Sequence, residues 1–215
     1  MKYLFLDTSS FYINIAIIVD NKIAYDFNEL NSPKLSENIF VYLDTVFKES
    51  KIKINEIDKV FIVNGPGSFT GVRVGLTIAK TMAWSLKIPI ISISTLELYA
   101  TMETKFKYTI PFINDRNDYL YAGIYDQDLN NYMPDTFLHI SELLVKIDNK
   151  NDYVLVGYDE IDGPLEIIKP ELNVLKIINK HENDEPVNVH LVKPNYLKMI
   201  DAERNLEKQN DKKDN

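Results

Sequence analysis

At 215 residues, the chain has room for one domain or two small ones. Hydrophobic residues make up 45% and charged residues 26%, as is typical of a globular protein with a substantial core. The formal net charge of −8 argues against a broad nucleic-acid-binding surface. The absence of cysteine excludes disulfides, a thiol nucleophile and a Cys-ligated zinc site.

The beginning of the chain and its apolar runs indicate where the protein works. The N-terminal segment reaches an acidic residue, Asp7, too early for a signal peptide. No apolar run in the sequence approaches the length of a membrane span. We therefore expect a cytoplasmic protein that makes no contact with a membrane.

The first third of the chain predicts three strands and a helix. Apolar runs at residues 2–6, 12–19 and 22–27 are typical of strands, and Asp20-Asn21 is a tight-turn signal between the last two. A helix is expected to open at Ser32-Pro33, because proline is favoured in the first turn of a helix. Its apolar residues follow the 3.6-residue period: Ile39, Phe40, Leu43, Val46 and Phe47.

The remaining elements complete one α/β unit and predict a second. Strands at 59–63 and 88–93, a helix at 70–86 and a short helix from Thr95 give the order βββαβαβα. The second half predicts a shortened version of the same order, with strands at 108–113, 119–125, 136–139 and 153–157 and a helix at 141–147. We expect an α/β protein with an N-terminal domain at 1–105, a C-terminal domain at 106–200 and a charged, disordered tail at 201–215.

The most informative stretch is the glycine-rich junction at residues 64–75, which holds four of the seven glycines. A phosphate loop is one interpretation, but no Lys-Ser/Thr follows at Walker spacing, and Thr70 stands where a G-x-G-x-x-G motif needs its third glycine. The structural alternative is a tight turn followed by a helix cap at Ser68 or Thr70. That alternative leaves two glycines inside the helix unexplained, each at a cost of about 1 kcal/mol.

Small residues recur every four positions along the predicted helix, at Gly71, Gly75, Ala79 and Ala83. Such a stripe lets another backbone or helix approach closely. Larger apolar residues flank the stripe and could pack on the sheet or on a partner: Val72, Leu76, Ile78 and Met82. We interpret this face as a docking surface for another protein.

Polar residues that could carry chemistry are few. An acidic residue at a strand end, here in Asp7-Thr8-Ser9, can hold Mg²⁺ and a phosphate, but it can also simply cap the turn. The three histidines lack the spacing of metal ligands, no serine lies in a G-x-S-x-G motif, and Asp115-Arg116 is more typical of a salt-bridged loop than of a catalytic pair. We therefore expect no metal, no cofactor and no peptidase chemistry.

The junction motif resembles the signature of the bacterial TsaB (YeaZ) family: Gly65-Pro-Gly-Ser-Phe-Thr-Gly-Val-Arg-Val-Gly-Leu76, followed by Ala79-Lys80. Further segments resemble the family along most of the chain. They are Leu6-Asp7-Thr8, Ser36-Glu37, Ile113-Asn114-Asp115-Arg116 and Pro194-Asn195-Tyr196-Leu197-Lys198. Leu35 and Asn114 depart from the family pattern, which has a histidine and an acid at these two places.

The resemblance implies an actin-like, ribonuclease-H-like ATPase fold with two tandem domains, each opening βββα. It implies a non-catalytic subunit that binds and activates TsaD in forming N6-threonylcarbamoyladenosine on the tRNA adenosine beside the anticodon. TsaE would join the larger assembly, tRNA would be contacted only through the complex, and the chain would also self-associate as a dimer through the same helices. Asp7, Thr8 and Ser9 would then be a vestigial nucleotide turn.

These inferences give a docking surface on the two predicted N-terminal helices. It comprises Ser36, Glu37, Phe40, Gly71, Val72, Gly75, Leu76, Ala79, Met82 and Ala83. A bulky residue at Gly75 is expected to block association with TsaD while leaving the monomer folded. The rival hypothesis is an autonomous actin-like ATP-binding kinase or ATPase that uses Asp7 as a metal ligand.

Overall fold

A computed structural model describes residues 1–198. The predicted tail at 201–215 lies outside the described residues. No helix within residues 1–198 is long and apolar enough to cross a membrane.

The first half of the chain forms a sheet with three helices, and the second half forms another sheet with two. The first eight elements are β1 (Lys2–Asp7), β2 (Tyr12–Val19), β3 (Lys22–Leu30), α1 (Leu35–Ser50), β4 (Lys59–Val63), α2 (Phe69–Leu86), β5 (Ile90–Ile93) and α3 (Thr95–Tyr99). The others are β6 (Tyr108–Asn114), β7 (Tyr119–Asp126), β8 (Asn131–His139), α4 (Ile140–Val145), β9 (Tyr153–Val156), β10 (Ile167–Ile168) and α5 (Val174–His181). Short 3₁₀ helices lie at Ile54–Glu56 and Lys150–Asp152.

The two five-stranded sheets have the same topology. The first has the order β3-β2-β1-β4-β5, and the second has the order β8-β7-β6-β9-β10. In each sheet, the first three strands of the unit pair antiparallel. The fourth strand then pairs parallel with the first strand, and the fifth pairs parallel with the fourth. This repetition confirms the predicted α/β fold class, with two tandem units that each open βββα.

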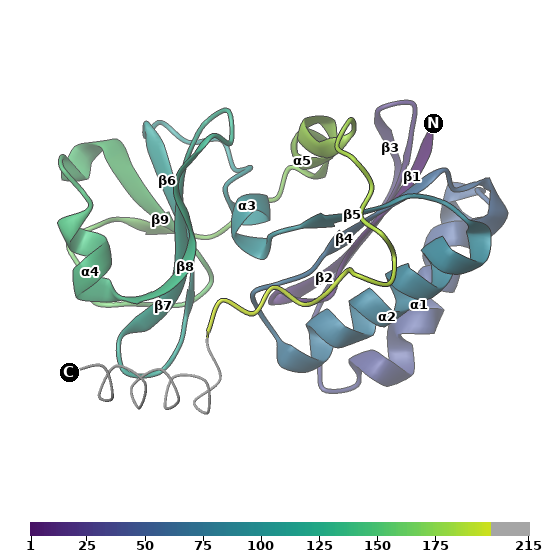
Figure 1. The fold of residues 1–215 in the computed structure, drawn as a ribbon, viewed down its shortest axis with the longest axis horizontal. Helices are drawn as coiled ribbons and strands as arrows, with labels where there is room; N and C mark the ends of the chain where they lie inside the picture. Colours follow the sequence, from purple (N-terminus) through teal and green to yellow (C-terminus); the bar gives the residue numbers. More distant parts are fainter. Residues whose placement is uncertain (199–215) are drawn as a thin grey trace, which may run out of the picture.

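Helices cover both faces of the first sheet (Figure 1). On one face, α1 and α2 pack against side chains of β1, β2 and β4 in a continuous apolar cluster. On the other face, Ile177 and Ile178 of α5 pack against Tyr3, Phe5 and Phe61. Because both faces are covered, β1 and β4 are buried along almost their whole length, which is why they are continuous apolar runs in the sequence.

The structure adds one helix that the sequence analysis missed and shifts the start of another. α5 follows the second sheet in the chain but returns to the first sheet, where the Asn173 side chain caps it by accepting a hydrogen bond from Lys176 N. Helix α1 begins at Leu35 rather than at Ser32-Pro33, and its N-cap residue, Lys34, makes no side-chain cap. The predicted β2–β3 turn is confirmed, since Asp20 and Asn21 have φ values of 48° and 60°.

Candidate functional site

The glycine-rich junction connects β4 to α2. Gly65 has a φ of 102°, a left-handed conformation that only glycine adopts at little cost. Ser68 is the N-cap of α2, and its side chain accepts a hydrogen bond from Gly71 N at 3.2 Å. The turn and the cap proposed as the structural alternative are therefore both present.

The group that comes close to this junction is the chain's own turn after β1. A Cβ on Gly67 would lie 2.3 Å from the Ser9 carbonyl oxygen. A Cβ on Gly71 would lie 1.9 Å from the Thr8 carbonyl oxygen, and one on Gly75 would lie 2.3 Å from Thr8 Oγ1. The glycines are required because α2 packs directly on the β1 turn, and this contact lies within the monomer.

Internal hydrogen bonds occupy the predicted nucleotide turn. The carboxylate of Asp7 accepts hydrogen bonds from Ser9 N at 2.8 Å, Ser9 Oγ at 2.7 Å and Ser10 Oγ at 2.5 Å. Ser9 Oγ also lies 2.9 Å from Thr95 Oγ1, and Thr8 Oγ1 donates to Gly71 O at 2.7 Å. Asp7 and Thr8 are fully buried, so the turn presents its polar groups to the chain itself.

The environment of Asp7 disfavours a role as metal ligand. Burial raises the pKa of this carboxyl above its ordinary value, although the hydrogen bonds from Ser9 and Ser10 oppose that effect. Ligation of Mg²⁺ needs an ionised, accessible carboxylate, and this one is inaccessible to solvent. Within residues 1–198, no group of three or more His, Cys, Asp or Glu side chains is arranged to hold a metal ion.

The docking stripe expected on α2 faces inward, which corrects the prediction from sequence. All seven α2 residues assigned to it are buried: Gly71, Val72, Gly75, Leu76, Ala79, Met82 and Ala83. They belong to the core or, for the two glycines, pack on the turn at Thr8. The physical reason is that small residues allow close approach both to a partner and to the chain itself, and here α2 packs closely on the first sheet and on the turn at Thr8. A bulky residue at Gly75 would therefore disturb the monomer itself.

Helix α1 contributes the exposed part of the predicted surface. Ser36 and Glu37 are exposed in its first turn, and the Phe40 side chain has an exposed fraction of 67%. Beside Phe40, α1 and α2 border an apolar groove of 650 Å³. Its apolar lining comprises Phe40, Leu43, Phe47, Ile52, Ile54, Ile78 and Met82. Of the seven buried α2 residues, Met82 alone lines it.

Sequence reasoning missed the segment after α1 that completes this groove. Ile52 and Ile54 line it from the loop after α1, and Ile54 has an exposed fraction of 48%. The signal available in the sequence was the alternation of isoleucine with lysine in Lys51-Ile52-Lys53-Ile54, just after the predicted helix. Large apolar patches that stay exposed on a protein surface are typical of interaction sites.

The C-terminal strap, residues 186–198, crosses α2 and reaches the second sheet. Lys80 Nζ on α2 donates a hydrogen bond to Val192 O at 2.9 Å. Tyr196 OH accepts from Arg73 Nη2 at 2.9 Å, and Lys198 Nζ pairs with Asp115 Oδ2 at 2.6 Å. The predicted interpretation of Asp115-Arg116 as a salt-bridged loop is therefore confirmed for Asp115.

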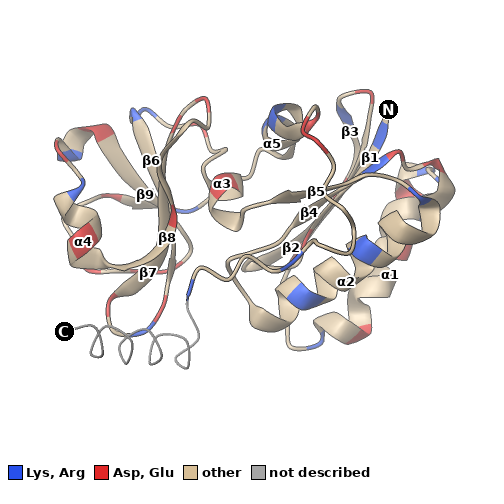
Figure 2. Cartoon of the chain, in the orientation of Figure 1, with Lys and Arg blue, Asp and Glu red and all other residues tan. Residues whose placement is uncertain are grey.

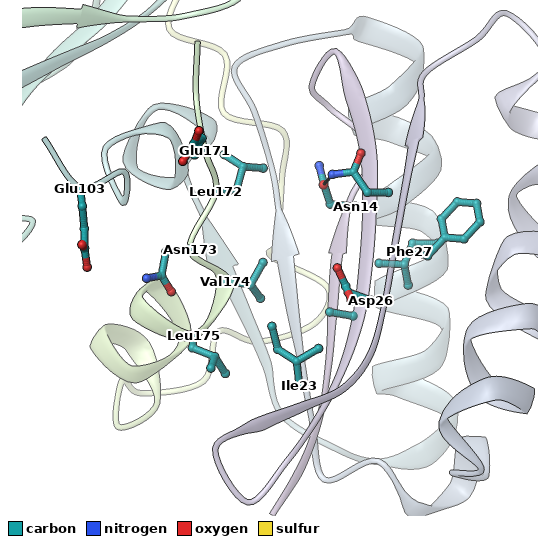
Figure 3. Close-up of a pocket in the computed structure, with 13 residues that line it drawn as sticks. Asn14, Ile23, Asp26, Phe27, Glu103, Glu171, Leu172, Asn173, Val174 and Leu175 are labelled. Carbon is teal, nitrogen blue, oxygen red and sulfur yellow. Dashed lines mark hydrogen bonds between the residues drawn. The ribbon is translucent and has the colours of Figure 1, made fainter. Parts of the chain in front are cut away.

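A second pocket, of 480 Å³, lies on the opposite face of the first sheet (Figure 3). Asn14 and Asp26 lie on its strand wall, and Glu103, Glu171 and Asn173 lie on the other wall. Its lining holds three carboxylates and, among the described residues, no lysine or arginine. Such a pocket repels phosphate, so it offers no alternative nucleotide site.

Comparisons with known proteins decide the family. The family model described as TsaD, tRNA N6-adenosine threonylcarbamoyltransferase, matches residues 28–162. The tRNA threonylcarbamoyladenosine biosynthesis protein TsaB of Bacillus subtilis is 28% identical over 223 residues, which cover 94% of this chain and 96% of that protein. The chain belongs to this family, in its TsaB (YeaZ) group.

Other TsaB relatives and two solved structures agree. The Haemophilus influenzae protein of the same name is 35% identical over 100 residues, covering 46% of this chain and 42% of that protein. A Pseudomonas aeruginosa structure described as similar to peptidase YeaZ has a TM-score of 0.80 at 20% identity, covering 92% of this chain and 99% of that chain. A second structure, titled YeaZ from the same organism, has a TM-score of 0.79 at 20% identity, covering 91% and 99%. With the family match, this likeness confirms the predicted actin-like fold.

Proposed function

We propose that the chain is a TsaB subunit that takes part in forming N6-threonylcarbamoyladenosine on tRNA. The printed names of the Bacillus subtilis and Haemophilus influenzae relatives support this role. The family model, which covers residues 28–162, bears the name of the transferase that makes this modification. The target adenosine beside the anticodon is part of the proposal.

The proposed role is non-catalytic. Its support is the Asp7 turn, where the carboxylate accepts three internal hydrogen bonds and the neighbouring glycines contact the turn itself. A phosphate-binding turn instead directs its backbone N–H groups toward an anion. Nothing at Asp7 favours the rival ATPase or kinase hypothesis.

The observation that carries the proposed partnership is the apolar groove between α1 and α2. At 650 Å³ and with Phe40 exposed at its edge, it offers a site for apolar side chains of TsaD. Basic and acidic residues occur on these two helices (Figure 2), which suits a polar rim around an apolar centre. Phe40 and Met82 are the predicted docking residues that line this groove.

The wider assembly follows from the same proposal. TsaE joins the complex of this chain with TsaD, and a homodimer forms through the same groove when TsaD is absent. The chain contacts tRNA only through the complex, since its net charge is −8 and its charges of both signs are interspersed (Figure 2).

The localisation and the domain division are also part of the proposal. We place the protein in the cytoplasm. We propose domains at 1–105 and 106–200, with α5 and the C-terminal strap returning to the first.

The test is binding to TsaD with a charge placed in the groove. Phe40→Glu puts a carboxylate at an exposed position, so the monomer stays folded while an apolar contact is lost. We expect at least a tenfold weaker affinity for TsaD by isothermal titration. Val41→Glu is the matched control, because Val41 is the next residue on α1, is 61% exposed and does not line the groove.

The Val41→Glu control separates loss of a contact in the groove from a general effect of added charge on TsaD binding. Val41→Glu is expected to bind TsaD as the unaltered chain does. Unchanged affinity in Phe40→Glu would show that TsaD binds elsewhere. Equal losses in both variants would show a general effect of charge rather than a contact in the groove.

A further inference from the structure

An aromatic ring from the second half of the chain lies among three rings of the first half. Tyr158, which follows β9, lies 5.2 Å from the Phe11 ring at an interplanar angle of 23°. It also lies 5.5 Å from Tyr12 and 5.6 Å from Tyr99, the latter edge-on at 89°. We call these four residues the aromatic lock. Burial raises the pKa of Tyr158 to about 12, in keeping with this enclosed position.

The rings of the lock border the space between the two sheets. A cavity of 220 Å³ remains there, lined by Ser9, Ser10, Phe112 and Tyr158 among others. Sites for small molecules usually measure about 300–1,000 Å³. The remaining space is therefore too small for a nucleotide, and the aromatic rings replace a ligand as the contact between the sheets.

Two further contacts join the halves away from the lock. Ser94, the N-cap of α3, donates a hydrogen bond to Asp135 of β8, and Tyr125 OH donates to the same carboxylate at 2.6 Å. The C-terminal strap bonds to Asn64 through Asn195 N at 2.8 Å before it reaches the second sheet. The halves thus also meet outside the aromatic lock.

Two domains joined by a small, polar interface are expected to move relative to one another. Here the interface is apolar as well as polar, since Tyr125 and Leu129 of the second half belong to the core cluster of the first sheet. We infer that the aromatic lock holds the two sheets as one rigid body, with the cleft between them closed without a ligand. This inference is independent of the proposed TsaD partnership.

Hydrogen–deuterium exchange of the full chain tests the inference. In Tyr158→Ala, the amides of residues 9–12, 110 and 112–114 border the opened cleft, and we expect them to exchange about tenfold faster. Amides of α1 are expected to be unchanged. Tyr158→Phe is expected to match the unaltered chain, because the lock depends on the ring. Within residues 1–198, the Tyr158 hydroxyl makes no hydrogen bond, so its removal leaves the ring contacts intact.

A surface control and a mild variant complete the test. Tyr132→Ala removes a 60% exposed tyrosine of the second sheet, outside the lock, and is expected to leave exchange at residues 9–12 unchanged. Phe11 is 55% exposed, so Phe11→Ala will fold even if Tyr158→Ala does not, and it is expected to speed exchange there by a smaller factor. Exchange equal to that of the unaltered chain in Phe11→Ala and in any folded Tyr158→Ala would overturn the inference.

Discussion

At the scale of single residues, the contact between Gly75 and Thr8 decides how the glycine-rich junction is understood. Thr8 is fully buried and its hydroxyl is bonded to Gly71 O, so it cannot move aside cheaply. Gly75 thus serves the packing of α2 on the turn after β1. A larger residue at position 75 is therefore expected to lower the stability of the monomer, whereas the sequence alone predicted that it would block association with TsaD.

Gly75→Ala is expected to destabilise the monomer. The new methyl group would lie 2.3 Å from Thr8 Oγ1 and 3.2 Å from Ile62 Cδ1, an overpacking that costs about 1–3 kcal/mol. The gain in helix propensity, about 1 kcal/mol, offsets part of this cost. Urea unfolding measures the difference. Gly163→Ala is the control, because its Cβ would meet only Ile140 Cδ1 at 3.9 Å; equal midpoints for both variants would contradict the packing role.

The sequence could reveal that α2 needs a face of small residues, but not what covers that face. A stripe of Gly71, Gly75, Ala79 and Ala83 has the same spacing whether a partner helix or a strand turn packs on it. Thr8 lies more than sixty positions away in the chain, and only the fold brings it to Gly71. Phe40 was predicted as a docking residue, but its helical period, which it shares with Ile39 and Leu43, does not by itself show that it is exposed.

At the scale of elements, an ion-pair cluster holds α5 to α3. Glu97 of α3 pairs with Lys180 at 2.9 Å and with His181 Nε2 at 3.0 Å, and His181 Nδ1 lies 2.6 Å from Asp184. Burial alone lowers the pKa of His181, but the two carboxylates outweigh it and raise the pKa above 6.5. Burial alone raises the pKa of Glu97, but His181 and Lys180 lower it below 4.5.

These shifts predict how stability depends on pH. The raised pKa of His181 contributes stability that is complete below pH 6.5 and is lost as the pH rises through the folded-state value. The lowered pKa of Glu97 contributes stability that is complete above pH 4.5 and is lost as the pH falls through its folded-state value. The cluster therefore stabilises the docked α5 most between pH 4.5 and 6.5.

His181→Gln isolates the histidine contribution. In the unaltered chain, the urea midpoint is expected to fall between pH 6 and pH 8, and in the variant this fall is expected to be smaller, because glutamine does not titrate. The two chains should approach each other at pH 8. A fall of the same size in both would show that His181 does not link α5 to proton binding.

The strands of the first sheet were predictable from the sequence, whereas α5 was not. The run of β2, residues 12–19, is apolar and ends at the turn residues Asp20 and Asn21, so local chemistry defines it. α5 has eight residues, little more than two turns, so it is too short to be stable alone. Packing of its apolar side on the first sheet stabilises it. Its local signals were the capping residue Asn173, the helical spacing of its apolar residues, and the basic residues Lys180 and His181 in its last turn.

At the scale of the whole molecule, the two sheets share a topology but differ in their coverings. The first sheet carries α1 and α2 on one face and α5 on the other, and α1 and α2 border the apolar groove. In the space between the sheets, Tyr158 lies among Phe11, Tyr12 and Tyr99, and a cavity of only 220 Å³ remains beside these rings. We therefore expect the chain to act through its surface and not through its cleft.

The most direct test is formation of N6-threonylcarbamoyladenosine by TsaD and TsaE with altered forms of this chain. Asp7→Asn preserves shape, and the Ser9 and Ser10 hydroxyls can both donate and accept, so the turn stays folded. With TsaD binding confirmed first, we predict that Asp7→Asn supports modification at the unaltered rate while Phe40→Glu does not. Loss of modification in an Asp7→Asn chain that still binds TsaD would contradict the account, because it would assign chemistry to the buried turn.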